Sequence, residues 1–436
     1  MAKRQEHTII AFTGRMNVGK SSLLNLLSGQ KDFAIVDDHP GTTTDVVATK
    51  MEIHGIGPIK ALDTAGLDED SALGKKKRKK VFEVIEEADL TFIMIDLLKT
   101  HNSDFALEKQ AIKKALEYHN QVLILYNLFP NKLSLKQLSH LENQTNQKLN
   151  LNSNQTPYQK NQIPSLRLNV LNSKEQKNLI DFIHLHLKTE KKEIDLIPLK
   201  AKEGYVLLNI PMDEETPQSR LLRPQDMAVE KLLRKQFIPV LFRMDLKKAR
   251  QGEKKEQQRF LNLIDHLKNS PEGLKLVITD SQAIDTVNNL VPSDILLTTF
   301  SVIMANYMSY GNLALFQKGL KAFSNLKNKD KILIMESCNH NRQCNDIGTQ
   351  QIPNLIKEKL GLNLEIDFSF GRVMPEDINP YKLIIHCGGC MIDRQKYARR
   401  ILKIKAAEIP ITNYGLFLSW VHNAKAAERV VEIFKI

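Results

Sequence analysis

One stretch near the amino terminus constrains the fold more than any other part of the sequence. Residues 14–21 read GRMNVGKS and fit the pattern GxxxxGKS. The apolar run 7–11 precedes them, and four leucines follow at helical spacing: Leu23, Leu24, Leu26 and Leu27. A strand, a loop and a helix in this order place backbone amides at the positive end of the helix, where they bind phosphate groups. The sequence therefore predicts a nucleotide-binding domain of the α/β class.

Apolar runs and helical patterns continue to alternate through the first part of the chain. Strand-like runs at 59–63, 90–96 and 121–126 are separated by helical patterns at 75–88 and 104–118. This alternation predicts a parallel-type sheet with crossover helices. A polar Asn/Gln/Lys mixture at 131–162 is expected to form, in part, a surface loop, and an amphipathic helix is expected at 173–187, before a charged linker.

A second alternation of strands and helices follows the linker. We expect strands at 206–210, 238–243, 274–280, 331–335, 364–368 and 383–386, with a helix at 223–235. A chain of 436 residues suits several domains. We expect a P-loop domain at 1–188, a small central α/β domain at 189–268 and a C-terminal α/β domain at 269–436.

Charge and hydropathy limit the environment of the protein. The formal net charge is +12, but the basic residues are scattered and do not interleave with aromatic residues. We therefore expect a lysine-rich solvated surface and no nucleic-acid partner. Neither a membrane-spanning apolar run nor a signal-peptide core is evident, so a cytoplasmic protein without membrane contact is expected.

The phosphate-binding stretch predicts specific contacts with a nucleotide. Lys20 would reach the β- and γ-phosphates and Ser21 would bind magnesium, while the remaining expected contacts are Gly14, Asn17, Val18, Gly19 and Ser22. Two later segments, GTTTD at 41–45 and DTAG at 63–66, resemble the switch segments of GTPases. The resemblance implies that Thr43 binds magnesium, that Asp63 holds a magnesium-bound water and that the Gly66 amide senses the γ-phosphate. Lys20, Thr43, Asp63 and Gly66 would then be the catalytic residues with GTP and Mg²⁺.

Three positions depart from the common GTPase pattern. Leu67 stands where Ras-like enzymes carry a water-orienting glutamine, so intrinsic hydrolysis is expected to be slow. Asn17 resembles the asparagine of potassium-activated TrmE and Era loops, and a plain loop-stabilising asparagine is the other reading. Asn127 is an expected nucleotide contact, but Asn127-Leu-Phe-Pro130 replaces Asn-Lys-x-Asp, which removes the acceptor for two guanine donors and puts guanine specificity in doubt. A binding scaffold with a decayed nucleotide site is the alternative.

All four cysteines lie in the last quarter of the chain, at Cys338, Cys344, Cys387 and Cys390. Cys338 follows one predicted strand and Cys387 follows another, so two distant segments would meet at the carboxyl edge of a sheet. Such a group favours metal or redox chemistry in a protein without secretion signals. Zinc, an iron-sulfur cluster and redox thiols all remain open, with His340, His386 or Cys344 as the fourth ligand of a zinc ion.

The spacing of these residues resembles one known family. Cys-x-His at 338–340, then 45 intervening residues, then His-Cys-x-x-Cys at 386–390, behind a GTPase domain, resembles the HydF family of FeFe-hydrogenase maturation GTPases. Further short stretches also resemble the family, at 220–225, 279–282, 346–348, 375–377 and 410–415. The resemblance as a whole extends over nearly the whole chain.

The resemblance implies a function beyond nucleotide hydrolysis. The central domain would be a dimerisation domain and the C-terminal domain would bind a 4Fe-4S cluster through Cys338, Cys387 and Cys390. The fourth iron would be open or held by His340 or His386, and it would face a transient diiron precursor, while Cys344 lies outside the family pattern. The implied partners are the FeFe-hydrogenase apo-protein and the other maturation proteins, with the chain as a homodimer. The runner-up is a ribosome-assembly or RNA-modification GTPase with a C-terminal zinc site.

Overall fold

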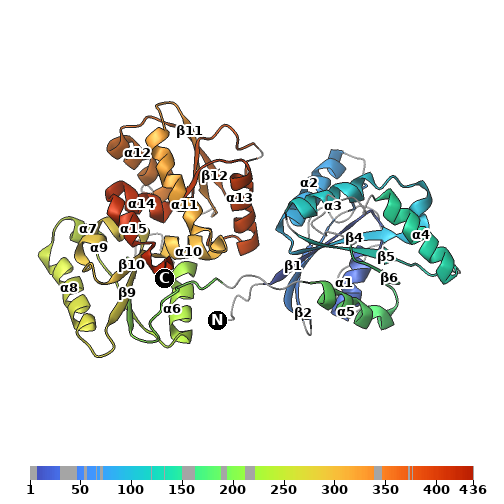
Figure 1. Ribbon diagram of the computed structural model, residues 1–436, viewed down its shortest axis with the longest axis horizontal. Helices are drawn as coiled ribbons and strands as arrows, with labels where there is room; N and C mark the ends of the chain where they lie inside the picture. Colours follow the sequence, from blue (N-terminus) through green and yellow to red (C-terminus); the bar gives the residue numbers. More distant parts are fainter. Residues whose placement is uncertain are drawn as a thin grey trace. The chain divides into compact units, whose positions relative to one another are not determined.

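The computed structural model divides the chain into two compact units, residues 1–191 and 192–436 (Figure 1). The structure describes residues 7–29, 47–53, 56–64, 66–68, 72–118, 120–131, 133–149, 163–187, 194–211, 221–337, 346–371, 374–375 and 377–435.

The first unit is built on one six-stranded sheet of order β2-β3-β1-β4-β5-β6. Its strands are β1 (Thr8–Gly14), β2 (Val47–Ile53), β3 (Gly57–Asp63), β4 (Leu90–Asp96), β5 (Gln121–Asn127) and β6 (Ser165–Leu168). All neighbouring strands are parallel except β2 and β3, which form an antiparallel pair. The predicted α/β class is confirmed, with an antiparallel edge strand that was not expected.

Helices cover both faces of this sheet (Figure 1). They are α1 (Lys20–Ser28), α2 (Ala72–Glu87), α3 (Ala106–Glu117), α4 (Leu135–Lys148) and α5 (Gln176–His186), with short helical turns η1 (Leu97–Asn102) and η2 (Ser173–Glu175). Alternate side chains of β1 enter different cores, because successive residues of a strand point to opposite faces. Phe12 packs on the side of α1 and α5, whereas Ala11 packs with Val84 of α2.

Part of the expected polar loop is a helix. α4 occupies 135–148, and Ser134 and Gln137 form a capping box at its start. Leu138 and Leu141 are buried on one face. The polar composition of this segment therefore reflects a solvated helix with a narrow apolar face, while 151–162 lies outside the described residues.

The second unit contains two four-stranded sheets, of order β10-β9-β7-β8 and β12-β11-β13-β14, and every neighbouring pair is parallel. The strands are β7 (Tyr205–Asn209), β8 (Ile238–Phe242), β9 (Leu274–Thr279), β10 (Leu296–Thr299), β11 (Lys331–Glu336), β12 (Glu365–Phe370), β13 (Leu383–His386) and β14 (Ile411–Asn413). One continuous hydrophobic core serves both sheets. Because β9 and β10 belong to the first of them, that sheet extends beyond the predicted boundary at 268.

Helices surround these two sheets. They are α6 (Arg223–Arg234), α7 (Leu246–Arg250), α8 (Lys254–Lys268), α9 (Ile284–Leu290), α10 (Phe300–Met308), α11 (Leu313–Leu320), α12 (Ile352–Leu360), α13 (Arg394–Ala406), α14 (Tyr414–His422) and α15 (Ala424–Arg429), with short turns η3 (Ser281–Ala283), η4 (Lys321–Asn325), η5 (Ile347–Gln351) and η6 (Glu432–Phe434). In the described part of the chain, no helix has the length and apolar character that crossing a membrane requires.

Candidate functional site

The phosphate loop joins β1 to α1 and contains two residues with left-handed backbone. Asn17 has a φ of 58° and Gly19 has a φ of 99°. A side chain at position 19 would collide with its surroundings, because a Cβ there would lie 2.8 Å from Asn127 Nδ2 and 2.9 Å from Val170 Cγ2. Glycine at this position therefore lets the loop pass close beneath β5 and the turn after β6.

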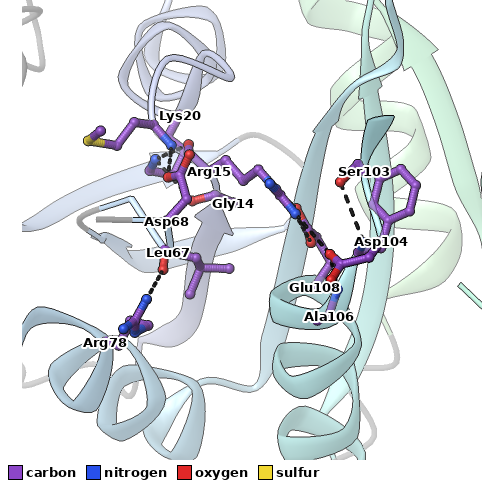
Figure 2. Close-up of polar contacts among 12 residues, drawn as sticks. Gly14, Arg15, Lys20, Leu67, Asp68, Arg78, Ser103, Asp104, Ala106 and Glu108 are labelled. Atoms are coloured by element: carbon purple, nitrogen blue, oxygen red, sulfur yellow. Dashed lines mark hydrogen bonds and ion pairs between the residues drawn. The ribbon is translucent and has the colours of Figure 1, made fainter. Parts of the chain in front are cut away.

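Lys20 folds back over the loop that precedes it. Its Nζ donates to the carbonyl of Arg15 at 2.8 Å and to that of Gly14 at 3.3 Å (Figure 2). Burial lowers the pKa of Lys20, and the charges of Asp63 and Asp68 only partly oppose that shift. A buried ammonium group held by two carbonyls is suited to receive a strongly anionic ligand.

Ser21 and Asp63 come together at the carboxyl end of β3, as the sequence predicts for a magnesium site. Ser21 Oγ donates to Asp63 Oδ2 at 2.9 Å. The other carboxylate oxygen, Oδ1, is buried and accepts no hydrogen bond from the described residues. Burial raises the pKa of Asp63, against the influence of Lys20, Ser21 and Thr64. A serine hydroxyl beside an unsatisfied carboxylate oxygen fits a hard divalent cation.

The segment after β3 packs directly against the phosphate loop. Leu67 N donates to the Gly14 carbonyl at 3.2 Å, and Met16 N donates to Asp68 Oδ1 at 2.7 Å. A Cβ at Gly66 would lie 2.2 Å from the Met16 side chain, so only glycine fits. Leu67 itself is buried and brings no polar group to the site, and Arg78 donates to its carbonyl (Figure 2). Thr43 and the rest of 41–45 lie outside the described residues.

An ion pair anchors the other side of the loop. Arg15 Nε donates to Glu108 Oε1 at 2.7 Å, and Arg15 Nη2 donates to Glu108 Oε2 at 3.4 Å (Figure 2). Arg15 Nη2 also lies 3.7 Å from Asp104 Oδ1. Glu108 is 2% exposed. The hydrogen bond to Glu108 raises the pKa of Arg15 despite the opposing effect of burial. Sequence analysis missed Arg15, Asp68 and Glu108, because nothing in the local pattern links residues so far apart.

Asn127 connects three segments of the nucleotide site. It is fully buried at the end of β5. Its Nδ2 donates to the Val18 carbonyl at 2.9 Å, and its Oδ1 accepts from Val170 N at 3.2 Å. Asn127 therefore fastens the phosphate loop to the turn after β6, with Pro130 exposed beyond it.

Two of the three expected cluster cysteines lie together after β13. Neither Cys387 nor Cys390 is in a disulfide. Cys387 Sγ accepts hydrogen bonds from Ser337 N at 3.2 Å and from Gly389 N at 3.4 Å. Ser337 directly precedes Cys338 in the sequence, so the end of β11 reaches Cys387 as the parallel pairing of β11 with β13 requires. Cys338, His340 and Cys344 lie outside the described residues, and the described ones hold no group of three metal-binding side chains.

The cysteine turn is held by its backbone and buried around its thiols. Arg223 of α6 donates to the carbonyls of Cys390 at 2.7 Å and Ile392 at 3.3 Å, and Tyr397 donates to that of Cys387 at 3.2 Å. Burial, together with Cys387, raises the pKa of Cys390 to about 11. Burial also raises the pKa of Cys387. Amide donors aimed at a buried sulfur are a feature of sites that bind iron-sulfur clusters or zinc as thiolates.

His386, one of the two histidines predicted as a fourth ligand, points into the protein. Its Nδ1 lies 2.9 Å from the Cys387 carbonyl and its Nε2 lies 3.4 Å from Arg400 Nη1. Because arginine can only donate, Nε2 accepts and the proton sits on Nδ1. Burial, with a smaller effect of Arg400, lowers the pKa of His386 to about 3. Both ring nitrogens are therefore engaged within the protein.

Comparison with protein families accounts for most of the chain in three parts. Residues 9–128 match the family model described as 50S ribosome-binding GTPase. Residues 195–309 match the hydrogen maturase F dimerization domain, and residues 314–433 match the hydrogen maturase F tetramerization domain.

Similar curated and solved proteins match the first unit. The tRNA modification GTPase MnmE of Nitrosomonas eutropha is 44% identical over 93 residues, which cover 21% of this chain and 20% of that protein. The MnmE of Acetivibrio thermocellus is 47% identical over 92 residues, with the same coverage. The chain thus spans about a fifth of the length of these relatives. Among solved structures, Aquifex aeolicus Era bound to GDP and AlF4⁻ has a TM-score of 0.35 at 24% identity, over 42% of this chain and 57% of that one.

Proposed function

From its membership of the hydrogen maturase F family of GTPases, which take part in hydrogenase maturation, we infer the function of this chain. We propose that it is a scaffold and carrier for the diiron subcluster of FeFe-hydrogenase. In this proposal it holds a 4Fe-4S cluster, receives the diiron precursor and delivers it to the apo-hydrogenase. One observation carries the proposal: at the carboxyl edge of β11 and β13, two backbone amides donate hydrogen bonds to the Cys387 sulfur.

Cys387 and Cys390 would hold the cluster together with Cys338. A cluster on three cysteines supplies an open iron position, at which a cargo can be exchanged. The chain's residues provide the setting: Ser337 and Gly389 stabilise the Cys387 thiolate, and Arg223 fixes the turn that carries Cys390. Because His386 is engaged by Arg400, the proposal leaves the fourth iron open or assigns it to His340.

The GTPase domain is of the TrmE and Era type. We propose that Lys20 binds the β- and γ-phosphates, that Ser21, Asp63 and Thr43 hold Mg²⁺ and that Gly66 senses the γ-phosphate. Leu67 brings no water-orienting group, so hydrolysis would be slow, and Asn17 would offer an oxygen to an activating K⁺. In this scheme the nucleotide times the exchange of partners and is not an energy source for synthesis.

The matches to dimerization and tetramerization domains indicate a homo-oligomer. We propose that the basic surface, with a formal charge of +12, favours docking of an apo-hydrogenase through acidic residues on that partner. The alternative, an RNA-modification GTPase with a zinc site, shares the GTPase domain but leaves the matches at 195–309 and 314–433 unexplained.

Metal and sulfide analysis with EPR on anaerobically purified, dithionite-reduced protein tests the cluster. We expect iron and sulfide at about four per chain and a signal that Cys387→Ala abolishes. Cys344→Ala is the matched control, because Cys344 lies outside the predicted ligand set, and it should leave the signal unchanged. One zinc per chain without sulfide would instead favour the zinc-bearing RNA-modification GTPase.

A further inference from the structure

Among the described residues, the base-reading end of the nucleotide site lacks the carboxylate that selects guanine. Guanine presents two adjacent donors, N1–H and the 2-amino group, and one carboxylate can accept from both. In the Asn-Lys-x-Asp pattern this carboxylate would stand at position 130, where this chain has Pro130, which is exposed and has no side-chain acceptor. Leu128 likewise replaces the lysine.

Other side-chain acceptors at this end of the site already accept hydrogen bonds from the backbone of the surrounding loops. Three asparagine oxygens accept from nearby backbone amides: Asn127 from Val170 at 3.2 Å, Asn131 from Leu133 at 3.0 Å and Asn169 from Leu171 at 3.0 Å. These side chains therefore shape the loops, and their neutral amide oxygens, each already accepting one backbone amide, are weaker acceptors for two guanine donors than an ionised carboxylate.

A carboxylate on the adjacent strand also has partners within its own turn. Asp96 ends β4 and is the register partner of Asn127. Its Oδ1 accepts from Leu98 N at 3.0 Å, and its Oδ2 lies 3.3 Å from Lys99 Nζ. Asp96 thus caps its own turn and is neutralised by a neighbouring lysine.

The described loops at this end of the site also carry apolar side chains. Leu128 and Phe129 are half-buried beside Pro130, and Leu171, on the turn fastened by Asn127, is 62% exposed. Apolar and aromatic side chains contact the face of any purine without reading its edge.

We propose that this site binds purine nucleoside triphosphates through the phosphate loop and apolar base contacts, and discriminates GTP from ATP by no more than about tenfold. A site that reads base donors with dedicated acceptors discriminates by about 10⁴-fold or more, because the wrong ligand leaves buried polar groups unpaired. This inference rests on the proposed nucleotide-binding function and specifies its substrate class. GTP remains a substrate, and its base adds little selectivity.

Binding of fluorescent, non-hydrolysable GTP, ATP and ITP analogues to the full-length protein with Mg²⁺ tests the proposal. ITP lacks the 2-amino group, so it reports on that contact alone. For the wild type we expect dissociation constants within about tenfold of one another. Leu128→Lys with Pro130→Asp should raise the preference for GTP over both other nucleotides by about thirtyfold or more. Leu133→Asp, which adds a carboxylate to an exposed position of the same loop, should leave the ratios unchanged.

Two results would overturn the inference while nucleotide binding stands. One is a wild-type preference for GTP over ATP above about tenfold. The other is an unchanged GTP-to-ATP ratio in a double variant whose circular dichroism matches the wild type. If the wild type bound none of the three nucleotides better than Lys20→Ala does, the proposed nucleotide function would fail, and this inference with it.

Discussion

At the scale of single residues, the Arg15–Glu108 pair ties the phosphate loop to α3. Glu108 is buried and Arg15 is partly exposed, so removing Arg15 leaves a poorly solvated carboxylate, whereas removing Glu108 leaves a partly solvated guanidinium. We expect Glu108→Ala to lower the free energy of unfolding by about 2–3 kcal/mol, measured by urea denaturation. Arg15→Ala should cost at least as much, because it leaves the buried Glu108 carboxylate without its partner, and a double-mutant cycle should give a coupling above about 1 kcal/mol. Additive effects of the two substitutions would contradict a functional pair.

Asp63 carries a stability cost that its ligand would relieve. Burial raises the pKa of its carboxyl, which means that the charged form destabilises the folded protein as pH rises above the unfolded pKa. Asp63→Asn removes the charge and keeps an acceptor for Ser21. At pH 7 without nucleotide, we expect this variant to melt about 2–4 °C higher than the wild type. It should also lose the stabilisation by Mg²⁺ and GTP in the same thermal assay, whereas a lower melting temperature would argue against a destabilising charge.

Residues of the nucleotide site were predictable where chemistry follows a local pattern. Gly14, Lys20, Ser21 and Asp63 were placed from short segments whose mechanism demands those residue types. Asp68 and Glu108 were not, because their contacts to the loop cross 52 and 93 residues of sequence. The orientation of His386 was equally hidden, since the sequence around it does not show that Arg400 occupies its second nitrogen.

At the scale of secondary-structure elements, α6 supports the cysteine turn through one side chain at its start. Arg223 donates to the carbonyls of Cys390 and Ile392. Arg223→Ala should loosen this turn and lower the iron retained after anaerobic gel filtration severalfold, with a broadened EPR signal. Arg234→Ala is the matched control, because Arg234 ends the same helix and pairs only with Glu230 among the partners seen. Equal iron retention in both variants would contradict a positioning role for Arg223.

Elements were predictable where their apolar periodicity is strong. The buried strands β1, β4, β5 and β13 read as continuous apolar runs, as strands covered on both faces do. α4 was missed because Asn and Gln dominate its solvated face, and its start is marked only by the Ser134–Gln137 capping box. β10 and β14 are four and three residues long, too short for alternation to show.

At the scale of the whole molecule, the domain boundaries at 188 and 268 stay predictions, and strand pairing describes how the segments are joined. The first compact unit ends at Lys191, and the first domain is predicted to end at 188. The boundary predicted at 268 separates α8 from β9, yet β9 pairs with β7 in one sheet. Linker composition marks the first division, whereas only strand pairing, which composition does not reveal, joins the segments on either side of the second.

The two units have separate hydrophobic cores, so each ligand should stabilise only the unit that binds it. A non-hydrolysable GTP analogue with Mg²⁺ at 100 times its dissociation constant adds about 2.7 kcal/mol to the stability of the unit it occupies. In differential scanning calorimetry of the anaerobically purified protein, we expect two transitions, and the analogue should raise only one of them. Lys20→Ala should lose that shift, because Lys20 belongs to the phosphate site, while Cys387→Ala should lower the other transition alone. A single transition that responds to both substitutions would mean that the units unfold as one, so that nucleotide and cluster binding are linked through stability.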